Sequence, residues 1–178
     1  IYRFPNSFPH FCNMAKSYIS TGSNLGDRLD FLQQGLDAVA KRVGKVIAVS
    51  SVVETPALGF KGNSFLNACF SVETNLPPKK VMQILLEIEK KHGRTRNTAM
   101  GYQNRTLDLD MIFYDDLALN DAALTLPHPS MEKRRFVLQP LAEIAPSKVH
   151  PITKKSIEEL LAKCEDKTVP IQTQYSLT

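Results

Sequence analysis

Two acidic residues, Asp108 and Asp110, stand two positions apart in a stretch that could place them for metal or phosphate chemistry. They alternate with the apolar residues Leu107, Leu109 and Met111, a pattern typical of a β-strand with one buried face. Both carboxylates would then project from the other face, with their Cα atoms about 6–7 Å apart. Such a pair repels itself unless a cation lies between the carboxylates, and Mg²⁺ is commonly held by one or two carboxylates together with substrate phosphates. A solvated strand face is the alternative interpretation, and the spacing alone leaves it open.

The segment before this strand is basic. Residues 90–105 contain five lysines and arginines and no acidic residue, namely Lys90, Lys91, Arg94, Arg96 and Arg105. Guanidinium groups beside a carboxylate pair suit a polyphosphate, with a metal on one side and arginines on the other. A long irregular loop of this kind is also typical of a lid or binding segment. A basic solvated loop after a helix C-terminus is the alternative, but the combination favours nucleotide chemistry.

A histidine in a stiff turn is a further candidate. His128 stands between Pro127 and Pro129, a few residues before Arg134. The rigid backbone suggests a positioned ligand for an anion or a nucleotide, although a lone histidine in a turn is often structural.

Three residues could line a pocket for a flat heterocycle. Phe65 and Phe136 would supply aromatic surface and Asn67 an amide. By themselves they are equally plausible as core and rim.

Composition and missing motifs narrow the class of protein. The chain has 178 residues, a net charge of +4, 43% apolar and 22% charged residues, which is ordinary for one globular domain. No apolar run approaches the roughly 20 residues of a membrane span. Three scattered cysteines without a CxxC pair indicate a reducing compartment, so we expect a cytoplasmic protein. The P-loop, GxGxxG, HExxH, GxSxG and RNA-recognition aromatic motifs are all absent.

Periodicity predicts the elements that would position these residues. Residues 17–21, 46–53, 65–73 and 106–111 are predicted as strands. A first helix spans the apolar positions 29–43, with Asn24 or Asp27 at its start and Gly44 at its end. A second helix begins at Pro77 and Pro78 and ends at Gly93, and shorter helices are expected near 131–141 and 155–163.

The order β-α-β-β-α-β predicts an α+β, ferredoxin-like fold. This fold is an antiparallel sheet with helices packed on one face and ligand loops on the other. We expect a single domain over residues 14–165. Residues 1–13 are interpreted as an N-terminal tail (a tag or an extension) and residues 166–178 as a C-terminal tail.

Six segments together resemble the 6-hydroxymethyl-7,8-dihydropterin pyrophosphokinase family. They are GSNLGDR (22–28), ETPALG (54–59), FLNA (65–68), GRTR (93–96), NRTLDLDMIFY (104–114) and PHPSMEKRRFVLQPLAEIAP (127–146). The resemblance covers residues 18–161. It implies a ferredoxin-like enzyme that uses ATP and two Mg²⁺ ions. Such an enzyme transfers diphosphate to the hydroxymethyl group of the pterin and releases AMP, a step of tetrahydrofolate biosynthesis.

The resemblance also implies roles for particular residues. Metal ligation falls to Asp108 and Asp110, and action on the transferring phosphates to Arg94 and Arg105. The implied nucleotide contacts are Arg96, Met111, Thr125, His128 and Arg134. The implied pterin pocket consists of Thr55, Pro56, Leu58, Phe65, Asn67 and Phe136, and Glu89 matches an acidic residue near the site.

Two positions depart from the family pattern. Tyr102 stands near a position where members often carry tryptophan, and Pro129 stands where some members carry tyrosine.

Two alternative functions compete with this one. A nucleic-acid-binding module would also suit the basic pI, but two strand aspartates would repel phosphate in the absence of a metal. A catalytically inactive ATP-binding regulator is disfavoured because no expected metal or arginine position is lost. We therefore expect the small-molecule substrates ATP and the pterin, no nucleic acid or membrane partner, and a monomer or weak dimer.

Overall fold

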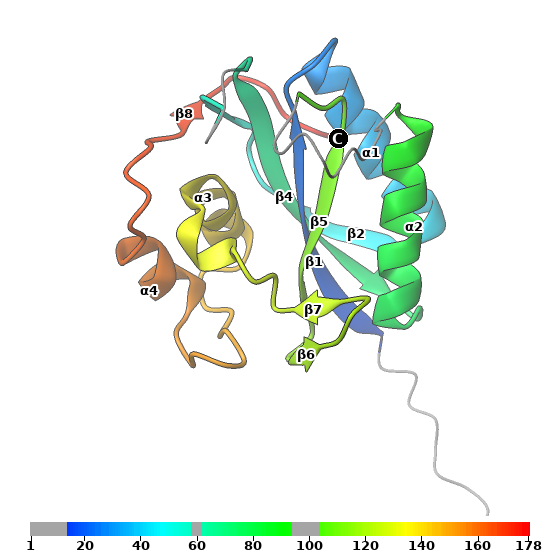
Figure 1. Cartoon of the computed structure of the whole chain (residues 1–178), viewed down its shortest axis with the longest axis vertical. Coiled ribbons are helices and arrows are strands. Elements are labelled where there is room, and N and C mark those ends of the chain that lie inside the picture. Colours follow the sequence, from blue (N-terminus) through cyan, green and yellow to red (C-terminus); the bar gives the residue numbers. More distant parts are fainter. Residues whose placement is uncertain (1–13, 58–61, 94–103) are drawn as a thin grey trace, which may run out of the picture.

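The computed structural model describes residues 14–57, 62–93 and 104–178. The interpreted N-terminal tail and the predicted site residues Leu58, Arg94 and Arg96 lie outside these ranges, as does Tyr102. A six-stranded sheet runs through the described chain (Figure 1). Its strands are β1 (Ala15–Ser23), β2 (Lys45–Val49), β3 (Val53–Thr55), β4 (Phe65–Thr74), β5 (Asp108–Tyr114) and β8 (Ile171–Gln172).

The long strand β4 organises the sheet. The strand order is β5-β1-β4-β3-β8, and β2 also pairs with β4. Every pairing is antiparallel. β4 pairs with β1 along one edge, from Ala15↔Thr74 to Ser23↔Leu66, and offers its other edge to β2 and β3. The predicted alternation of residues 65–73 is confirmed, because Leu66, Ala68, Phe70 and Val72 all join one buried cluster.

The prediction of one continuous strand over residues 46–53 was wrong. Residues 50–52 separate β2 from β3. At this interruption the Ser50 hydroxyl accepts a hydrogen bond from the Cys69 N–H at 2.9 Å, and the Ser50 N–H donates to the Cys69 carbonyl at 2.9 Å. A serine side chain thus takes the place of a backbone acceptor, so the two short strands share one edge of β4 without forming one ladder.

Helices α1 (Arg28–Arg42) and α2 (Pro78–Lys91) cover one face of the sheet, which we call the α1/α2 face (Figure 1). Asp27 is the residue that caps α1, since its side chain accepts from the Asp30 N–H at 3.1 Å. Gly44 follows the helix where the chain enters β2. A Cβ at this position would stand 2.0 Å from the Glu73 carbonyl oxygen, so only glycine permits the close approach to β4.

The apolar cluster under these helices forms the larger part of the core. Phe70 of β4 and Leu85 of α2 are fully buried in it. Its other large members include Ile19, Leu32, Leu36, Val39, Leu66, Val81, Ile88, Leu107, Leu109 and Met111. This cluster anchors the strands from behind.

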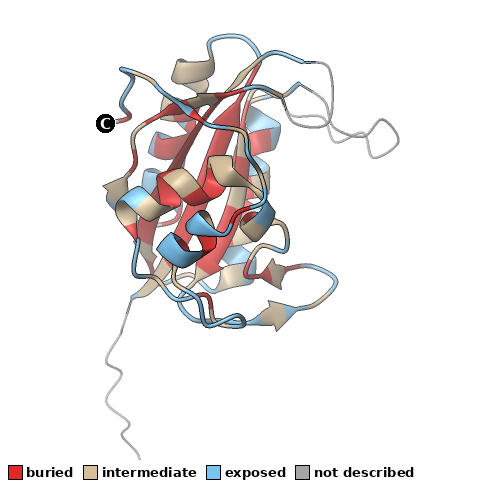
Figure 2. Cartoon of the chain, turned by 90° about the vertical axis from the view of Figure 1, so that its left-hand side faces the viewer, coloured by how far each residue is buried: buried red, intermediate tan, exposed pale blue. Residues whose placement is uncertain are grey.

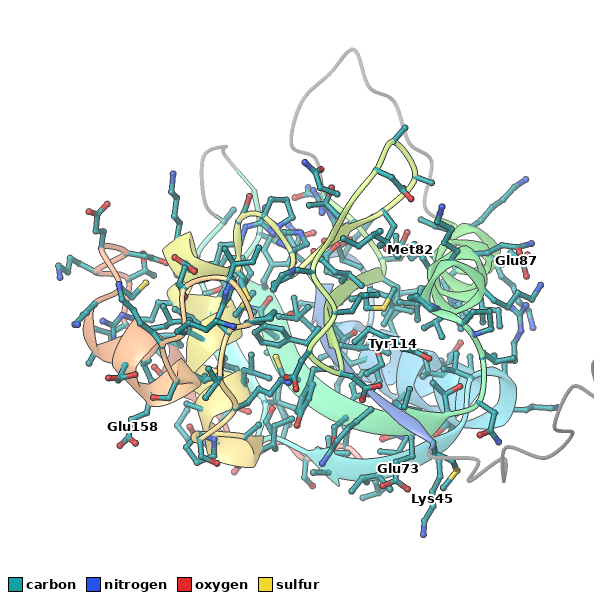
Figure 3. The ribbon with its side chains drawn as sticks, turned by 90° about the horizontal axis from the view of Figure 1, so that it is seen from below. Lys45, Glu73, Met82, Glu87, Tyr114 and Glu158 are labelled. Carbon is teal, nitrogen blue, oxygen red and sulfur yellow. The ribbon has the colours of Figure 1, made fainter. Side chains whose placement is uncertain are left out.

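Helices also lie on the opposite face, so the prediction of helices on one face only was wrong. A 3-10 turn (Met131–Lys133) leads into α3 (Arg135–Ile144), and α4 (Ile157–Ala162) packs beside α3 (Figures 1 and 2). Figure 3 shows the two helical layers from below, with Glu87 of α2 and Glu158 of α4 pointing outwards on opposite sides of the molecule. The second cluster comprises Tyr18, Cys69, Ile112 and Phe113 of the sheet with Met131, Val137, Leu138, Leu141, Ile157, Leu160 and Cys164. Apolar side chains on this face of β1, β4 and β5 therefore require a cover that the strand-helix order did not reveal.

Residues 166–178, expected to be a tail, pack against the fold. β8 pairs with β3 through Val53↔Gln172 and Glu54↔Ile171. Leu177 is buried in the α1/α2 cluster, and the Thr178 N–H donates to the Gln33 side-chain oxygen at 3.0 Å. The folded unit therefore extends beyond residue 165.

A small hairpin completes the described chain. It consists of β6 (Leu119–Asn120) and β7 (Thr125–Leu126), and it leads into the segment that carries His128. The His128 N–H donates to the Ile112 carbonyl of β5 at 3.0 Å, which fixes this segment against the edge of the sheet. None of the helices in the described ranges is long and apolar enough to cross a membrane.

Candidate active site

Strand β5 places the aspartate pair at its first and third residues. Asp108 and Asp110 are partly exposed, while Leu109 between them and Met111 after them are buried in the α1/α2 cluster. The two carboxylates therefore share the opposite face of the sheet, which we call the site face. β1 runs beside them, with Gly22 opposite Asp108 and Ser20 opposite Asp110.

Three basic side chains converge on the carboxylates. Arg105 donates from Nη1 to Asp108 Oδ2 at 2.5 Å, with both side chains about four-fifths buried. Asp110 Oδ2 lies 3.7 Å from Arg134 Nη1 and 3.9 Å from His128 Nε2, and neither of these two distances is a hydrogen bond. Arg105 precedes β5 in the sequence, whereas His128 and Arg134 follow it. The fold, rather than one basic segment, therefore brings these basic side chains together.

His128 is held in a defined orientation. Its Nδ1 accepts a hydrogen bond from the Ser130 N–H at 3.2 Å. In the neutral ring the proton is therefore on Nε2, the nitrogen nearer to Asp110. Burial lowers the pKa of His128, and the Asp110 carboxylate partly opposes that shift. The arrangement presents a ring N–H to the space beside the carboxylates.

Glu89 supports the aspartates from α2. Its side chain is 1% exposed, and its Oε1 accepts from the Leu109 N–H at 2.8 Å. Leu109 is the residue between Asp108 and Asp110, so a buried carboxylate fixes the backbone from which both site carboxylates project. In the described part of the chain, β5 is an edge strand, and this bond satisfies one backbone N–H on its outer side.

The predicted pterin residues begin on the neighbouring strands of the same face. Asn67 Nδ2 donates to Thr55 Oγ1 at 2.9 Å, and both side chains are buried. Gly22 pairs with Asn67 on one side and Asp108 on the other. Asn67 and Asp108 are thus separated by one strand, or about 10 Å. A Cβ at Gly22 would stand 3.0 Å from Asn67 Oδ1, so glycine keeps this row of the sheet clear for the amide.

The other predicted contacts are placed less uniformly. Phe65 begins β4 and Phe136 lies at the start of α3, where the Arg134 guanidinium stacks 5.8 Å from its ring centre. Pro56 is exposed just after β3. Thr125 Oγ1 donates to Asn120 Oδ1 at 3.2 Å across the β6-β7 hairpin. The Met111 side chain lies in the α1/α2 cluster, on the opposite side of β5 from Asp110.

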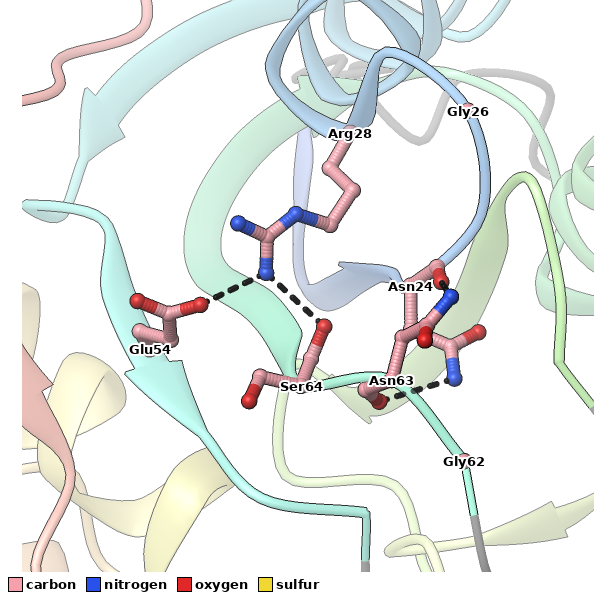
Figure 4. A pocket seen from close by; sticks show the side chains of 7 residues that line it. All are labelled: Asn24, Gly26, Arg28, Glu54, Gly62, Asn63 and Ser64. Atoms are coloured by element: carbon pink, nitrogen blue, oxygen red, sulfur yellow. Dashed lines mark hydrogen bonds and ion pairs between the residues drawn. The ribbon is translucent and has the colours of Figure 1, made fainter.

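A polar hollow opens where β1, β3 and the segment before β4 meet (Figure 4). Its volume is about 520 Å³, and it is lined by Asn24, Gly26, Arg28, Glu54, Gly62, Asn63 and Ser64. Arg28 Nη1 lies 2.7 Å from Glu54 Oε1 and donates to the Ser64 carbonyl at 2.8 Å. Arg28 had no predicted role, and Asn24 was predicted only as a possible helix cap. The motif GSNLGDR contained the signal, but the partners of these two residues lie far along the chain.

The donor set suits a hard divalent cation shared with a ligand. Asp108 and Asp110 supply carboxylate oxygens on one rigid strand, and Mg²⁺ prefers such oxygens with phosphate oxygens completing its shell. No group of three or more histidine, cysteine, aspartate or glutamate residues that could hold a metal occurs within the described ranges. Two carboxylates facing basic side chains on one face of the sheet are the arrangement typical of a phosphoryl-transfer site.

Comparison with known proteins places this class more closely. The sequence pattern of the 7,8-dihydro-6-hydroxymethylpterin-pyrophosphokinase family matches residues 18–146. The 2-amino-4-hydroxy-6-hydroxymethyldihydropteridine pyrophosphokinase of Synechocystis is 41% identical over 162 residues, which cover 90% of this chain and 81% of that protein. The protein of the same name from Aquifex aeolicus is 33% identical over 147 residues, covering 82% of this chain and 90% of that one.

A solved structure shares the fold. The crystal structure of an HPPK-DHPS protein in complex with substrates aligns with a TM-score of 0.72 at 14% identity. The alignment covers 85% of this chain and 43% of that one. The chain belongs to the 7,8-dihydro-6-hydroxymethylpterin-pyrophosphokinase family, as its sequence motifs indicated. It is an ATP-dependent diphosphotransferase of folate biosynthesis that acts on the hydroxymethyldihydropterin.

Proposed function

We propose that Asp108 and Asp110 form the reaction centre of this diphosphotransferase and hold two Mg²⁺ ions together with the ATP phosphates. The observation that carries the proposal is the convergence of Arg105, His128 and Arg134 on this carboxylate pair. Bound Mg²⁺ would neutralise phosphate charge and favour the deprotonated form of the attacking hydroxyl.

The protein's own groups act by holding and orienting the phosphates. Arg134 and the Nε2–H of His128 face Asp110 and can donate to phosphate oxygens placed there. Arg105 is braced by Asp108, so its guanidinium is already oriented before a nucleotide arrives. Arg94 would act on the transferring phosphates. Arg96 and Thr125 complete the proposed nucleotide contacts together with the backbone of Met111, whose side chain faces the α1/α2 cluster.

The pterin would bind on the same face, on the far side of β1. The Asn67 amide is fixed by its hydrogen bond to Thr55, which leaves a defined polar edge for a flat heterocycle. Phe65 and Phe136 would supply the aromatic walls. Pro56 and Leu58 complete the proposed pocket.

The proposed reaction is an in-line displacement at the β-phosphorus of ATP. The hydroxymethyl oxygen of the pterin forms a bond to the β-phosphorus, and the bond from that phosphorus to the α,β-bridging oxygen breaks. AMP leaves with the electron pair, and the hydroxyl proton is released to solvent. The arginines neutralise charge that builds on the phosphoryl oxygens, which is the main task left to the protein.

The strand order supports a ferredoxin-like topology for the catalytic unit. β5-β1-β4 with β2 on the outer edge of β4, and α1 and α2 as the connections, is the arrangement of a split βαβ sheet. We further propose a cytoplasmic protein that acts as a monomer or weak dimer. The buried free thiols of Cys69 and Cys164 are in keeping with a reducing compartment.

Analysis of the nucleotide products tests the reaction directly. Protein, Mg²⁺, ATP and 6-hydroxymethyl-7,8-dihydropterin should yield AMP and the pterin diphosphate in equal amounts, with no AMP when the pterin is omitted. Formation of ADP would move the attack to the γ-phosphorus and overturn the proposed geometry. Undiminished AMP production after thorough removal of divalent cations would overturn the metal assignment.

A further inference from the structure

We propose that Asn24 is a positioning residue that ties the pterin side of the site to the phosphate side. The inference rests on the proposed function for the identity of the two sides. Asn24 directly follows β1, is 1% exposed, and contacts two segments that are distant in the sequence. Figure 4 shows its contacts with one of them, at Asn63.

On the phosphate side, Asn24 holds the backbone of Arg105 by two hydrogen bonds. The Asn24 N–H donates to the Arg105 carbonyl at 3.0 Å, and the Arg105 N–H donates to Asn24 Oδ1 at 2.7 Å. The guanidinium of the same arginine holds Asp108. Asn24 therefore fixes the residue that braces one of the two proposed metal ligands.

On the pterin side, Asn24 and Asn63 bind each other reciprocally. Asn24 Nδ2 donates to the Asn63 carbonyl at 3.1 Å, and Asn63 Nδ2 donates to the Asn24 carbonyl at 3.3 Å. Two residues later Phe65 begins β4, and Asn67 follows on the same strand. Asn24 Nδ2 also donates to Asn104 Oδ1 at 2.7 Å, so one amide group serves both segments.

Only a carboxamide of this length fits the pattern. The site needs one acceptor for the Arg105 N–H and two donors for the oxygens of Asn63 and Asn104. Aspartate would keep the acceptor but place a second oxygen against those two oxygens. Asn24→Asp should therefore lose the side-chain bonds to Asn63 and Asn104 while retaining the side-chain bond to the Arg105 N–H. Asn24→Ala removes all three side-chain bonds and leaves only the bonds of the Asn24 backbone, to the Arg105 carbonyl and from the Asn63 side chain.

Asp27 provides a matched control in the same turn. Its side chain caps α1 through the Asp30 N–H and contacts neither segment of the site. Asp27→Ala should lower the melting temperature without changing the affinity for either ligand. A purely structural role for Asn24 would give the same result as this control.

The experiment measures binding of each ligand separately, in the presence of Mg²⁺. The pterin is titrated by its fluorescence, and the nucleotide by calorimetry with a non-hydrolysable ATP analogue. We expect Asn24→Asp to weaken pterin binding about tenfold, the size of the one hydrogen bond lost to the pterin-side segment. Nucleotide binding should weaken by less than threefold, because the side-chain bond to the Arg105 N–H is kept. Asn24→Ala should weaken pterin binding similarly and also lower kcat, because Arg105 loses one of its two hydrogen bonds to Asn24.

Asn63→Ala keeps the test decisive if the Asn24 variants fold poorly. Asn63 is exposed, and the substitution removes only its side-chain donor to the Asn24 carbonyl. A smaller loss of pterin affinity, with nucleotide affinity unchanged, is expected. Pterin affinity equal to that of the parent in Asn24→Asp and Asn63→Ala would overturn the inference. Equal losses for both ligands in either variant would also overturn it. A parent protein that binds both ligands but forms no AMP would instead refute the proposed function.

Discussion

The two faces of the sheet use the same strands for different purposes. On the α1/α2 face, every second residue of β4 (Leu66, Ala68, Phe70 and Val72) enters one apolar cluster. On the site face, the alternate residues are mixed: Cys69 packs under α3 and α4, whereas Asn67 belongs to the polar row with Asp108. Burial of one face makes the strands rigid, and that rigidity allows the other face to hold like charges close together. Substitutions on the two faces should therefore fail in different ways.

The largest effect is expected at Asp110 on the site face. Asp110→Ala should lower kcat/KM at least about a thousandfold, because a proposed metal ligand opposite Arg134 and His128 is lost. The side chain is about one-third exposed, so the melting temperature should change little. Steady-state kinetics and thermal denaturation measure the two quantities. Activity within tenfold of the parent would contradict the metal assignment.

The control for this prediction lies on the same segment of chain. Asp116 is an exposed acid just beyond the other end of β5, paired with Lys148 at 2.5 Å. Asp116→Ala should leave kcat/KM unchanged. A comparable loss in both variants would point to a general effect of charge rather than to the site.

Phe70 should show the opposite behaviour on the α1/α2 face. It is fully buried at the centre of that cluster, so Phe70→Ala should lower the free energy of unfolding by about 3–5 kcal/mol. The fraction that remains folded should keep the KM of the parent for both substrates. Urea denaturation monitored by circular dichroism gives the stability. A changed KM with unchanged stability would break the division between the faces.

Part of this division could be predicted from the sequence. Alternation within residues 65–73 and around Asp108 and Asp110 is a local property, and it correctly assigned the apolar sides of β4 and β5. The site residues Leu58, Arg94 and Arg96 lie outside the described ranges, so their roles stay predictions.

The errors concern interactions between distant residues. The interruption at Ser50 depends on Cys69 across the sheet, and the pairing of β8 depends on β3, more than 110 residues earlier. The role of Asn24 depends on partners 39 and 80 residues away. No window along the chain contains these pairs. Local periodicity therefore predicts which side of a strand is buried, but not which helix or loop covers it.

Glu89 connects the two faces and should show both kinds of effect. Glu89→Ala removes the buried acceptor of the Leu109 N–H, which should cost about 1–3 kcal/mol of stability. It should also lower kcat, because Asp108 and Asp110 project from the loosened backbone. Glu89→Gln keeps an acceptor of similar shape and should recover most of the stability.

Glu87 is the matched control on the same helix. It lies on the exposed side of α2, paired with Arg42. Glu87→Ala should leave both stability and kcat unchanged. If Glu89→Ala lowers stability but leaves kcat at the parent value, the support from α2 is structural only.

A pH-dependent effect is expected under α3 and α4. His150 is buried against Phe113, and its Nδ1 accepts from the Ile152 and Thr153 N–H groups. Burial lowers the pKa of His150, opposed by the Glu132 carboxylate. The unfolded chain therefore takes up the proton at a higher pH than the folded one. Its contribution to stability is full above the ordinary histidine pKa of about 6.5 and is lost as the pH falls toward the lower folded value.

The variant His150→Asn isolates this contribution. The asparagine oxygen can replace Nδ1 as acceptor but does not titrate. Between pH 8 and 5, the unfolding free energy of the variant should depend less steeply on pH than that of the parent. Equal slopes in urea titrations would show that His150 does not contribute.

The smallest effect expected is a gain in stability at Thr21. This residue is 1% exposed on the α1/α2 side of β1, between Ala68 and Leu109, and its hydroxyl has no hydrogen-bond partner in the described part of the chain. A buried hydroxyl without a partner is unfavourable, and valine has nearly the same shape. Thr21→Val should therefore raise the free energy of unfolding by up to about 1 kcal/mol with unchanged kcat/KM. A loss of stability would show that the apolar face depends on this hydroxyl, and the contrast between the two faces would then not extend to the end of β1.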